Sequence, residues 1–332
     1  MNIAILGSTG SIGNSTLEVI RQNKKDFSIN LLTAKSNHKL LIEQCKEFNP
    51  EFVYLEDEQA RKVLEDNVSD RKLRTCVIKS TKEFEEVIGS NETDVVVAGM
   101  VGIAGLIPVH FAIQKGKKVL LANKESYVVA GEYLNNLCKE TGACIFPIDS
   151  EHSAIHQCLN NEENKSGVSR IILTGSGGPF LNKDINDFGS ITPEEAINHP
   201  VWNMGRKISV DSSTLMNKGL EIIEARWLFN FENIEVLIHP EGIIHSLVEF
   251  KDNSVLAQLS SPDMKIPIAY GLGYPKRINS GSEQLNLKEI KSLNFMEPDL
   301  KKFPCLKLAM DLLPIGGNSF SILNASNEEC VD

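Results

Sequence analysis

NIAILGSTGSIG, residues 2–13, is the stretch that decides how the first half of this chain folds. Residues 2–6 are apolar and predict a buried strand, and residues 15–22 predict a helix. A strand, a glycine-rich turn and a helix form the phosphate-binding unit of dinucleotide-binding folds. Gly7 and Gly10 would let the backbone come close to a pyrophosphate. The spacing GxxGxxG is looser than GxGxxG, and a glycine turn without a ligand is the alternative.

Predicted strands and helices alternate along the rest of the first half. The strands lie at residues 29–32, 52–55, 75–78, 94–98 and 118–122, and the helices lie at residues 58–65, 81–88 and 102–115. This alternation predicts an α/β fold, a Rossmann-like doubly wound parallel sheet with helices on both faces. Ligands bind at the carboxyl ends of the strands in sheets of this kind.

The second half predicts an α+β region with an open mixed sheet. Its strands are predicted at residues 171–174, 235–238, 243–250 and 254–259. The exposed face of this sheet is a candidate surface for a homodimer. We expect four parts along the chain: a cofactor-binding domain at 1–148, a catalytic and dimerisation domain at 149–275, a linker at 276–303 and the start of a helical domain at 304–332.

Composition excludes several classes of protein. The chain has 332 residues, a net charge of −10 and 7 cysteines without a CxxC pair, which is typical of a reduced protein that holds no structural zinc. Because there is no long basic run, neither nucleic acid nor an anionic membrane is an expected partner. No apolar run reaches the ~20 residues that span a bilayer. The chain opens directly into a strand, so we expect no targeting peptide and a cytoplasmic location.

The end of the second predicted strand indicates which cofactor binds. An NAD site usually carries Asp or Glu there, to bind the ribose 2′-hydroxyl. This chain has Lys35, Ser36 and Asn37 instead, a cation with hydroxyl and amide groups that suit a 2′-phosphate. The sequence therefore predicts NADPH. Lys124 lies just past the strand at 118–122 and is a candidate to hold a phosphate or an oxyanion, with an exposed loop lysine as the equal alternative.

Two acidic residues follow a predicted strand at residues 143–148. If the chain stays extended there, Asp149 and Glu151 point the same way, and their carboxylates repel each other unless a cation lies between them. Oxygen ligands suit Mg²⁺ or Mn²⁺. The alternative is a turn with a helix N-cap and a first-turn acid. Farther on, Ser176 lies in a glycine-rich run that is either an anion-binding nest or a simple flexible turn.

The run VDSSTLMNKGLE, residues 210–221, is dense in groups that bind anions or metals. Residues 214–229 predict a helix with one buried face. A neighbouring face of this helix carries Asn217, Glu221 and Glu224. Ser212 or Ser213 would cap its start, where free N–H groups favour an anion. A capped surface helix with a Lys218–Glu221 pair is the alternative.

The segment HPVWNMGRK, residues 199–207, is irregular and mixes proline and glycine with aromatic and cationic side chains. It predicts a mobile loop that closes over a substrate, with Trp202 and Met204 as the apolar part of the lid. A packed surface loop, in which His199 is an ordinary hydrogen-bonded residue, is the alternative.

Taken together, these motifs resemble 1-deoxy-D-xylulose 5-phosphate reductoisomerases, the NADPH-dependent enzymes of the non-mevalonate isoprenoid pathway. The matching runs are GSTGSIG at 7–13, LANKES at 121–126, PIDSEHSAI at 147–155, TGSGGPF at 174–180, HPVWNMGRKISVDSSTLMNKGLEIIEARWLF at 199–229 and PCLKLAM at 304–310. The resemblance spans essentially the whole chain. It implies that a ketose phosphate is converted to 2-C-methyl-D-erythritol 4-phosphate by skeletal rearrangement and hydride reduction.

The resemblance also implies roles for individual residues. The implied ligands of a divalent metal (Mg²⁺, Mn²⁺ or Co²⁺) are Asp149, Glu151 and Glu221, and with Lys124 and His199 they form the implied catalytic set. The implied contacts to the substrate phosphate are Ser176, Ser212, Asn217 and Lys218, and Ser150 and Lys124 are implied substrate contacts beside the metal. Cofactor contacts, beside Lys35, are implied at Thr9, Gly10, Ser11, Ile12, Ser36, Asn37, Asn123, Glu125 and Gly205.

The chain departs from the family pattern in two places. Glu241 and Gly242 stand where the family usually has Gln-Ser, outside the expected site. The family also continues into a C-terminal helical domain, which we expect to be largely missing here. Two other functions therefore stay open: a truncated, inactive NADP-binding protein, and an NADP-dependent dehydrogenase without isomerase activity.

Overall fold

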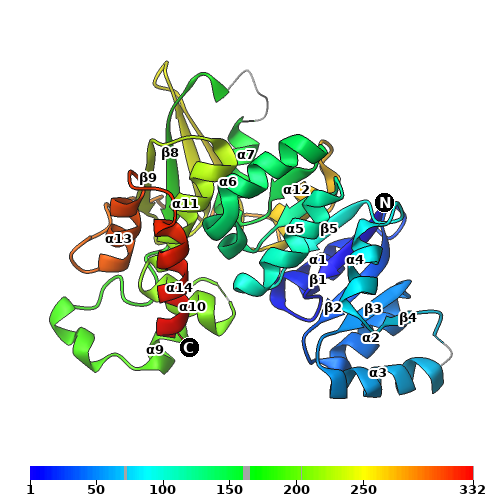
Figure 1. Cartoon of the computed structure of the whole chain (residues 1–332). Coiled ribbons are helices and arrows are strands. Elements are labelled where there is room, and N and C mark those ends of the chain that lie inside the picture. Colours follow the sequence, from blue (N-terminus) through cyan, green and yellow to red (C-terminus); the bar gives the residue numbers. More distant parts are fainter. Residues whose placement is uncertain (71–72, 160–164, 203, 332) are drawn as a thin grey trace. The chain divides into compact units, whose positions relative to one another are not determined.

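The computed structural model describes residues 1–70, 73–159, 165–202 and 204–331, which Figure 1 shows coloured along the sequence. The chain divides into two compact units. The first comprises Met1–Ser126, Glu132–Ile148 and Met264–Gly281, and the second comprises Tyr127–Gly131, Asp149–Asp263 and Ser282–Asp332. Within the described residues, no helix is both long enough and apolar enough to cross a membrane. The functional boundaries expected after residues 148, 275 and 303 stay predictions.

The first unit is built on a seven-stranded parallel sheet with the strand order β4-β3-β2-β1-β5-β6-β7. Its strands are β1 (Asn2–Leu6), β2 (Ser28–Ala34), β3 (Phe52–Leu55), β4 (Cys76–Ile78), β5 (Val95–Ala98), β6 (Lys118–Leu121) and β7 (Cys144–Pro147). The doubly wound sheet expected from the alternating pattern is confirmed. The strand order reverses at β1, and ligands bind at the carboxyl ends of the strands where such a reversal occurs.

Helices cover both faces of this sheet. They are α1 (Ser11–Gln22), α2 (His38–Phe48), α3 (Glu58–Asp70), α4 (Thr81–Gly89), the 3₁₀ turn η1 (Ile103–Gly105), α5 (Leu106–Gln114), most of α6 (Lys124–Thr141) and α12 (Lys265–Gly273). Ile3 and Ile5 of β1 pack into one apolar cluster with residues of α1, α2, α3 and α12. The alternate residues Ala4 and Leu6 are also 0% exposed. Burial on both faces explains why the strands are apolar runs without polar alternation.

The second unit is built on a four-stranded mixed sheet with the order β11-β10-β8-β9. Its strands are β8 (Val168–Gly175), β9 (Ile234–Ile238), β10 (Ile244–Phe250) and β11 (Val255–Leu259), and its helices are α7 (Ser150–Leu159), the 3₁₀ helix η2 (Ile185–Ser190), α9 (Pro193–Ile197), α10 (Arg206–Ser213), α11 (Met216–Phe229), α13 (Pro304–Leu312) and α14 (Ser319–Val331). β8 pairs parallel with β9 and antiparallel with β10, so the open mixed sheet is confirmed. Ile155 of α7 and Ile222 of α11 share one apolar cluster with Val248 of β10.

The helix predicted over residues 214–229 is wrong at its start. Leu215 has a φ of +58° and separates α10 from α11, so α11 begins at Met216. Ser212 and Ser213 therefore lie in the last turn of α10 and do not cap α11. A left-handed conformation is unfavourable for leucine. Its side chain is 3% exposed in the apolar cluster of the second unit, and this burial offsets the strain.

The extended chain predicted over residues 149–151 is also wrong. Ser150 begins α7, so Glu151 lies in the first helical turn. The N–H of Ser153 donates to the carbonyl of Asp149 at 2.8 Å. The local geometry is thus a helix start, which was the alternative to a strand end, and the two carboxylates must be brought together in another way.

Candidate active site

Carboxylates from two helices converge in the second unit. Asp149 and Glu151 lie at the start of α7, and Glu221 lies on α11. One oxygen of each of these three side chains lies within 4.8 Å of the others. Glu221 is 1% exposed. The sequence motifs at 147–155 and 199–229 are therefore joined by the packing of α7 beside α11.

Lys218 supplies a positive charge among these carboxylates. Its Nζ donates to Glu151 Oε1 at 2.9 Å and also to Glu221 Oε2. Burial alone would lower the pKa of Lys218, but the two carboxylates raise it, so the ammonium stays charged. Burial and the charge of Glu221 raise the pKa of Glu151 to about 7. A buried cluster of three carboxylates around the Lys218 ammonium favours a further cation, and its oxygen donors suit Mg²⁺ or Mn²⁺.

Two of the predicted substrate residues orient the carboxylates. Ser150 Oγ donates to Glu151 Oε2 at 2.5 Å. Asn217, one turn before Glu221 on α11, donates from Nδ2 to Glu221 Oε1. Each of these two carboxylates is therefore held by a neutral donor as well as by Lys218, and hydrogen bonds of this kind fix the direction in which a carboxylate presents its remaining lone pairs.

A buried pair beside the carboxylates was missed by the sequence reasoning. His152 and Glu224 are both 0% exposed, and His152 Nδ1 lies 3.2 Å from Glu224 Oε2. The Nε2 atom of the same ring donates to the backbone carbonyl of Glu221 at 2.9 Å. Burial alone would lower the pKa of His152, but Glu224 raises it to about 9. The pair ties α7 to α11, and the spacing of Glu224 three residues after Glu221 was the available signal.

His199 and Ser176 meet at the start of the predicted loop. His199 Nδ1 accepts the backbone N–H of Val201 at 3.2 Å and of Trp202 at 2.9 Å. A ring nitrogen that accepts a hydrogen bond carries no proton, so the proton lies on Nε2. Nε2 is 3.1 Å from Ser176 Oγ and donates to it. Burial lowers the pKa of His199, which agrees with a neutral ring.

The two apolar residues of the predicted lid are half-buried, and neither belongs to the apolar clusters around Ile222 and Leu220 in the described part of the second unit. The indole of Trp202 lies against His245, with ring centroids 6.0 Å apart. Asn203, between Trp202 and Met204, lies outside the described residues. Burial lowers the pKa of His245 to about 4, so this ring is a neutral partner for the indole. Gly205 is the N-cap of α10, exposed at the end of the same segment.

The glycine turn of the first unit follows β1, where the strand order reverses. Gly7 has a φ of +81°, and a Cβ on it would lie 3.0 Å from the carbonyl oxygen of Gly99. A Cβ on Gly13 would lie 2.4 Å from the backbone of Ser8, so only glycine fits at both positions. Helix α1 begins at Ser11 behind the N-cap Gly10, whose own side chain can offer no cap. Backbone N–H groups at such a helix start favour an anion.

The other predicted cofactor residues fall into an exposed and a buried group. Lys35, Ser36 and Asn37 follow β2 and are exposed, and Asn37 Oδ1 caps α2 by accepting the N–H of Leu40 at 3.2 Å. Asn123, by contrast, is 2% exposed.

The side-chain amide of Asn123 forms hydrogen bonds with the loop that follows β5. Its Nδ2 donates to the carbonyls of Met100 at 2.9 Å and Gly102 at 2.8 Å, and to the carboxylate of Glu125 at 3.0 Å. Asn123 therefore holds the loop that follows β5. Lys124 begins α6 and is 7% exposed.

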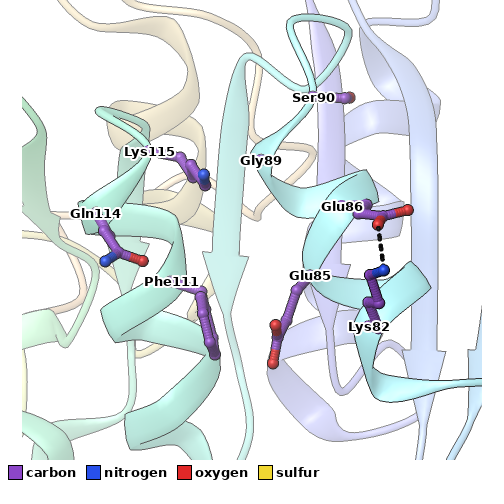
Figure 2. Close-up of a pocket in the computed structure, with 8 residues that line it drawn as sticks. All are labelled: Lys82, Glu85, Glu86, Gly89, Ser90, Phe111, Gln114 and Lys115. Atoms are coloured by element: carbon purple, nitrogen blue, oxygen red, sulfur yellow. Dashed lines mark ion pairs between the residues drawn. The ribbon is translucent and has the colours of Figure 1, made fainter.

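A surface hollow of about 390 Å³ lies between α4 and α5 (Figure 2). Its lining residues are Lys82, Glu85, Glu86, Gly89, Ser90, Phe111, Gln114 and Lys115. Lys82 and Glu86 form a 3.9 Å ion pair whose side chains are mostly exposed. None of the predicted functional residues lines this hollow, so it has no part in the candidate site.

Three family models match the chain. The model for 1-deoxy-D-xylulose 5-phosphate reductoisomerase matches residues 3–131, a C-terminal domain of the same enzyme matches residues 145–229, and a further DXP reductoisomerase C-terminal domain matches residues 259–332. Together these matches cover most of the chain.

Curated relatives and solved structures carry the same description. The 1-deoxy-D-xylulose 5-phosphate reductoisomerase of Actinobacillus pleuropneumoniae serotype 3 is 48% identical over 341 residues, covering 99% of this chain and 86% of that protein. That of Nitrosomonas eutropha is 48% identical over 337 residues, covering 100% and 82%. A crystal structure of DOX-P reductoisomerase with NADPH, fosmidomycin and magnesium has a TM-score of 0.95 at 44% identity, covering 100% and 84%. The Zymomonas mobilis enzyme with NADPH has a TM-score of 0.91 at 39% identity, covering 99% and 85%.

Proposed function

The chain belongs to the 1-deoxy-D-xylulose 5-phosphate reductoisomerase family, and we propose that it converts 1-deoxy-D-xylulose 5-phosphate to 2-C-methyl-D-erythritol 4-phosphate with NADPH and a divalent metal ion. The observation that carries this proposal is the convergence of Asp149, Glu151 and Glu221 beside Lys218. A plain dehydrogenase needs no such carboxylate cluster, whereas a carbon–carbon rearrangement needs charge stabilisation at oxygen atoms of the substrate.

We infer that Asp149, Glu151 and Glu221 would hold the metal ion. When bound, the ion would polarise the substrate carbonyl and stabilise negative charge on oxygen. Ser150 and Asn217 keep two of these carboxylates oriented. Lys218 lowers the electrostatic cost of bringing three carboxylates together. The ion predicted at this site is Mg²⁺, Mn²⁺ or Co²⁺.

The phosphate group of the substrate is assigned to Ser176, His199 and Ser212. The Nε2–H of His199 donates to Ser176 Oγ in this structure, and an incoming phosphate oxygen would accept from both the imidazole and the hydroxyl. Ser212, the next-to-last residue of α10, is half-buried. Trp202 and Met204 would then close over the substrate and exclude water, which strengthens the charge interactions beneath them.

The cofactor is assigned to the carboxyl ends of the parallel strands. The turn residues Thr9, Gly10, Ser11 and Ile12 would bind the pyrophosphate, and Lys35 with Ser36 would bind the 2′-phosphate. NADPH supplies the hydride that reduces the aldehyde formed by the rearrangement. The contacts predicted for Lys124 and Gly205 stay predictions, as does the cytoplasmic location.

One assay separates this function from its alternatives. NADPH oxidation would be followed with 1-deoxy-D-xylulose 5-phosphate, with and without Mg²⁺, and the product identified by mass spectrometry and NMR. We expect Mg²⁺-dependent oxidation and a branched product, both absent from Asp149→Asn. Oxidation that yields an unbranched product would indicate a plain dehydrogenase. NADPH binding without any oxidation would indicate an inactive NADP-binding protein.

The mixed sheet supports the proposal that two copies of the chain associate. β11 is an edge strand of that sheet, and Val255 and Leu256 are each 48% exposed although they point to opposite faces. An exposed apolar edge strand is a site of pairing between chains. Light scattering should give a dimer mass for the wild-type protein and a lower mass for Leu256→Lys, and a monomeric wild type would contradict the dimer.

A further inference from the structure

The outer half of the glycine turn, at Thr9, Gly10 and Ser11, is accessible to solvent, whereas its inner half, at Ser8, is buried and held by hydrogen bonds. Thr9 is half-buried and Gly10 and Ser11 are exposed, whereas Ser8 is 0% exposed. The backbone N–H of Ser8 donates to the carbonyl of Thr33 at 2.7 Å, so the inner half is fastened to the end of β2. The outer half is the part that a ligand would meet.

Gln44 of α2 also forms hydrogen bonds with the inner half of the turn. Its Nε2 donates to the carbonyl of Ser8 at 3.0 Å and to Asn14 Oδ1 at 3.1 Å. In return, Ser8 Oγ donates to Gln44 Oε1 at 2.8 Å. Asn14 Nδ2 then donates to the carbonyl of Thr9 at 3.3 Å, which extends the network to the outer half. Gln44 is 5% exposed.

The chemistry of this network requires a primary amide. Gln44 uses both amide hydrogens as donors and its carbonyl oxygen as an acceptor. A glutamate of the same size keeps only the acceptor when it is ionised, and methionine keeps neither function. Leaving the buried carbonyl of Ser8 and the amide oxygen of Asn14 without this donor would let the turn relax toward other partners.

We propose that Gln44 is a positioning residue that holds the glycine turn in its pyrophosphate-binding conformation. This inference rests on the proposed cofactor site. Gln44 lies on the same helix whose N-cap is Asn37, with Lys35 and Ser36 just before it. One rigid helix thereby links the turn to the candidate 2′-phosphate site. Gln44 itself acts through Ser8 and Asn14.

A pattern of binding constants follows from this role. NADPH and NADH share the pyrophosphate, so a relaxed turn weakens both cofactors by the same factor and leaves their ratio unchanged. Losses at Lys35 or Ser36 instead weaken NADPH alone. The turn contacts no reacting atom, so the loss is one of uniform binding, and kcat at saturating NADPH stays close to that of the wild type.

The test compares Gln44→Met with a matched control, Asn30→Leu. Asn30 is a buried amide of the same unit, 3% exposed, whose Nδ2 donates to Thr93 Oγ1 at 2.7 Å, away from the glycine turn. Dissociation constants for NADPH and NADH would be measured by fluorescence and kinetics by NADPH oxidation. For Gln44→Met we expect both constants to rise about 10-fold with kcat within about 2-fold of wild type. Asn30→Leu should change melting temperature without changing either constant.

Further variants keep the outcomes distinguishable. Gln44→Glu keeps the acceptor for Ser8 Oγ but places a carboxylate oxygen against the carbonyl of Ser8 and against Asn14 Oδ1. It should therefore raise both constants at least as far as Gln44→Met, and it covers the case in which the methionine variant does not fold. Equal cofactor affinities in both Gln44 variants and the Asn30 control would overturn the proposal, and so would a rise confined to NADPH. Lys35→Ala tests the cofactor site itself: an unchanged preference for NADPH over NADH in that variant would overturn the site and leave the Gln44 comparison intact.

Discussion

The glycine turn of the first unit and the carboxylate cluster of the second are built in opposite ways. The turn is a run of consecutive residues, 7–13, that offers backbone N–H groups and carries no charged side chain. The cluster joins Glu151 of α7 to Lys218 and Glu221 of α11, and these long charged side chains come from two distant parts of the sequence. Binding by backbone N–H groups depends on the conformation of the turn, whereas binding by charged side chains depends on each charge that is present. Substitutions in the cluster should therefore have the larger effects.

The largest effect is expected from Glu221→Gln. The variant keeps the shape of the side chain but removes one charged ligand, and the charge stabilisation lost amounts to several kcal/mol. We expect kcat to fall at least about 1,000-fold, the equivalent of about 4 kcal/mol. NADPH affinity should stay within about 2-fold, because the turn belongs to the other unit. Steady-state kinetics at saturating Mg²⁺ and NADPH fluorescence give the two values.

Glu232→Gln is the matched control for this loss. Glu232 is a carboxylate of the same unit whose side chain is 82% exposed and pairs with Arg226, so its variant should keep wild-type kinetics. Wild-type turnover by Glu221→Gln would contradict the role of Glu221 as a metal ligand. A loss of NADPH affinity in the same variant would contradict the independence of the carboxylate cluster and the glycine turn.

A smaller effect is expected at the lid, where the two tryptophans of the chain differ. Both are half-buried. Trp202 lies outside the apolar clusters around Ile222 and Leu220 in the described residues, whereas Trp227 packs against Phe320 in the cluster around Leu220. Trp202→Ala should lower kcat/KM about 10-fold or more, because water then reaches the substrate, with little change in melting temperature. Trp227→Ala should instead lose about 3–5 kcal/mol of folding stability. Thermal melts and kinetics on both variants distinguish the two roles. A large loss of stability in Trp202→Ala would show that Trp202 is a core residue and not part of a lid.

The smallest effect is expected from pH at His199. The pKa of His199 lies below its ordinary value of 6.5, so the ring is neutral above that pH and becomes charged only as the pH falls through its lowered pKa. Once protonated, Nδ1 can no longer accept the N–H groups of Val201 and Trp202, which together contribute roughly 1–3 kcal/mol to loop structure. We expect the substrate KM to be flat above pH 6.5 and to rise several-fold at lower pH.

His199→Asn provides the reference for this pH profile. Asparagine Oδ1 replaces Nδ1 as an acceptor and does not titrate, so the variant should show only the ionisation of the substrate phosphate, whose second pKa is near 6. Identical KM profiles for the two proteins would assign the whole pH dependence to the substrate and none to the loop.

Prediction from the sequence succeeded where the signal was local. The parallel sheet was predictable because apolar runs and turns repeat along the chain, and the glycine turn because Gly7 and Gly13 occupy positions that no other residue fits. It failed at Leu215 and at Ser150, where the chain leaves the conformation that its local pattern favours. Packing in the apolar cluster of the second unit outweighs propensity at Leu215, and α7 begins one residue after Asp149.

By itself, the sequence determined the strand–turn–helix unit at residues 2–22, the doubly wound sheet and the family of the chain, because periodicity and short motifs are properties of consecutive residues. The i, i+3 spacing on one helix already allowed a pair between Lys218 and Glu221. Only the tertiary structure decided that Glu151 joins this pair, that His152 pairs with Glu224, and that Gln44 bonds to the glycine turn. These last three contacts join residues on different elements, and no spacing along one element encodes them. They exist because burial in the two units leaves each polar group only a few partners within reach.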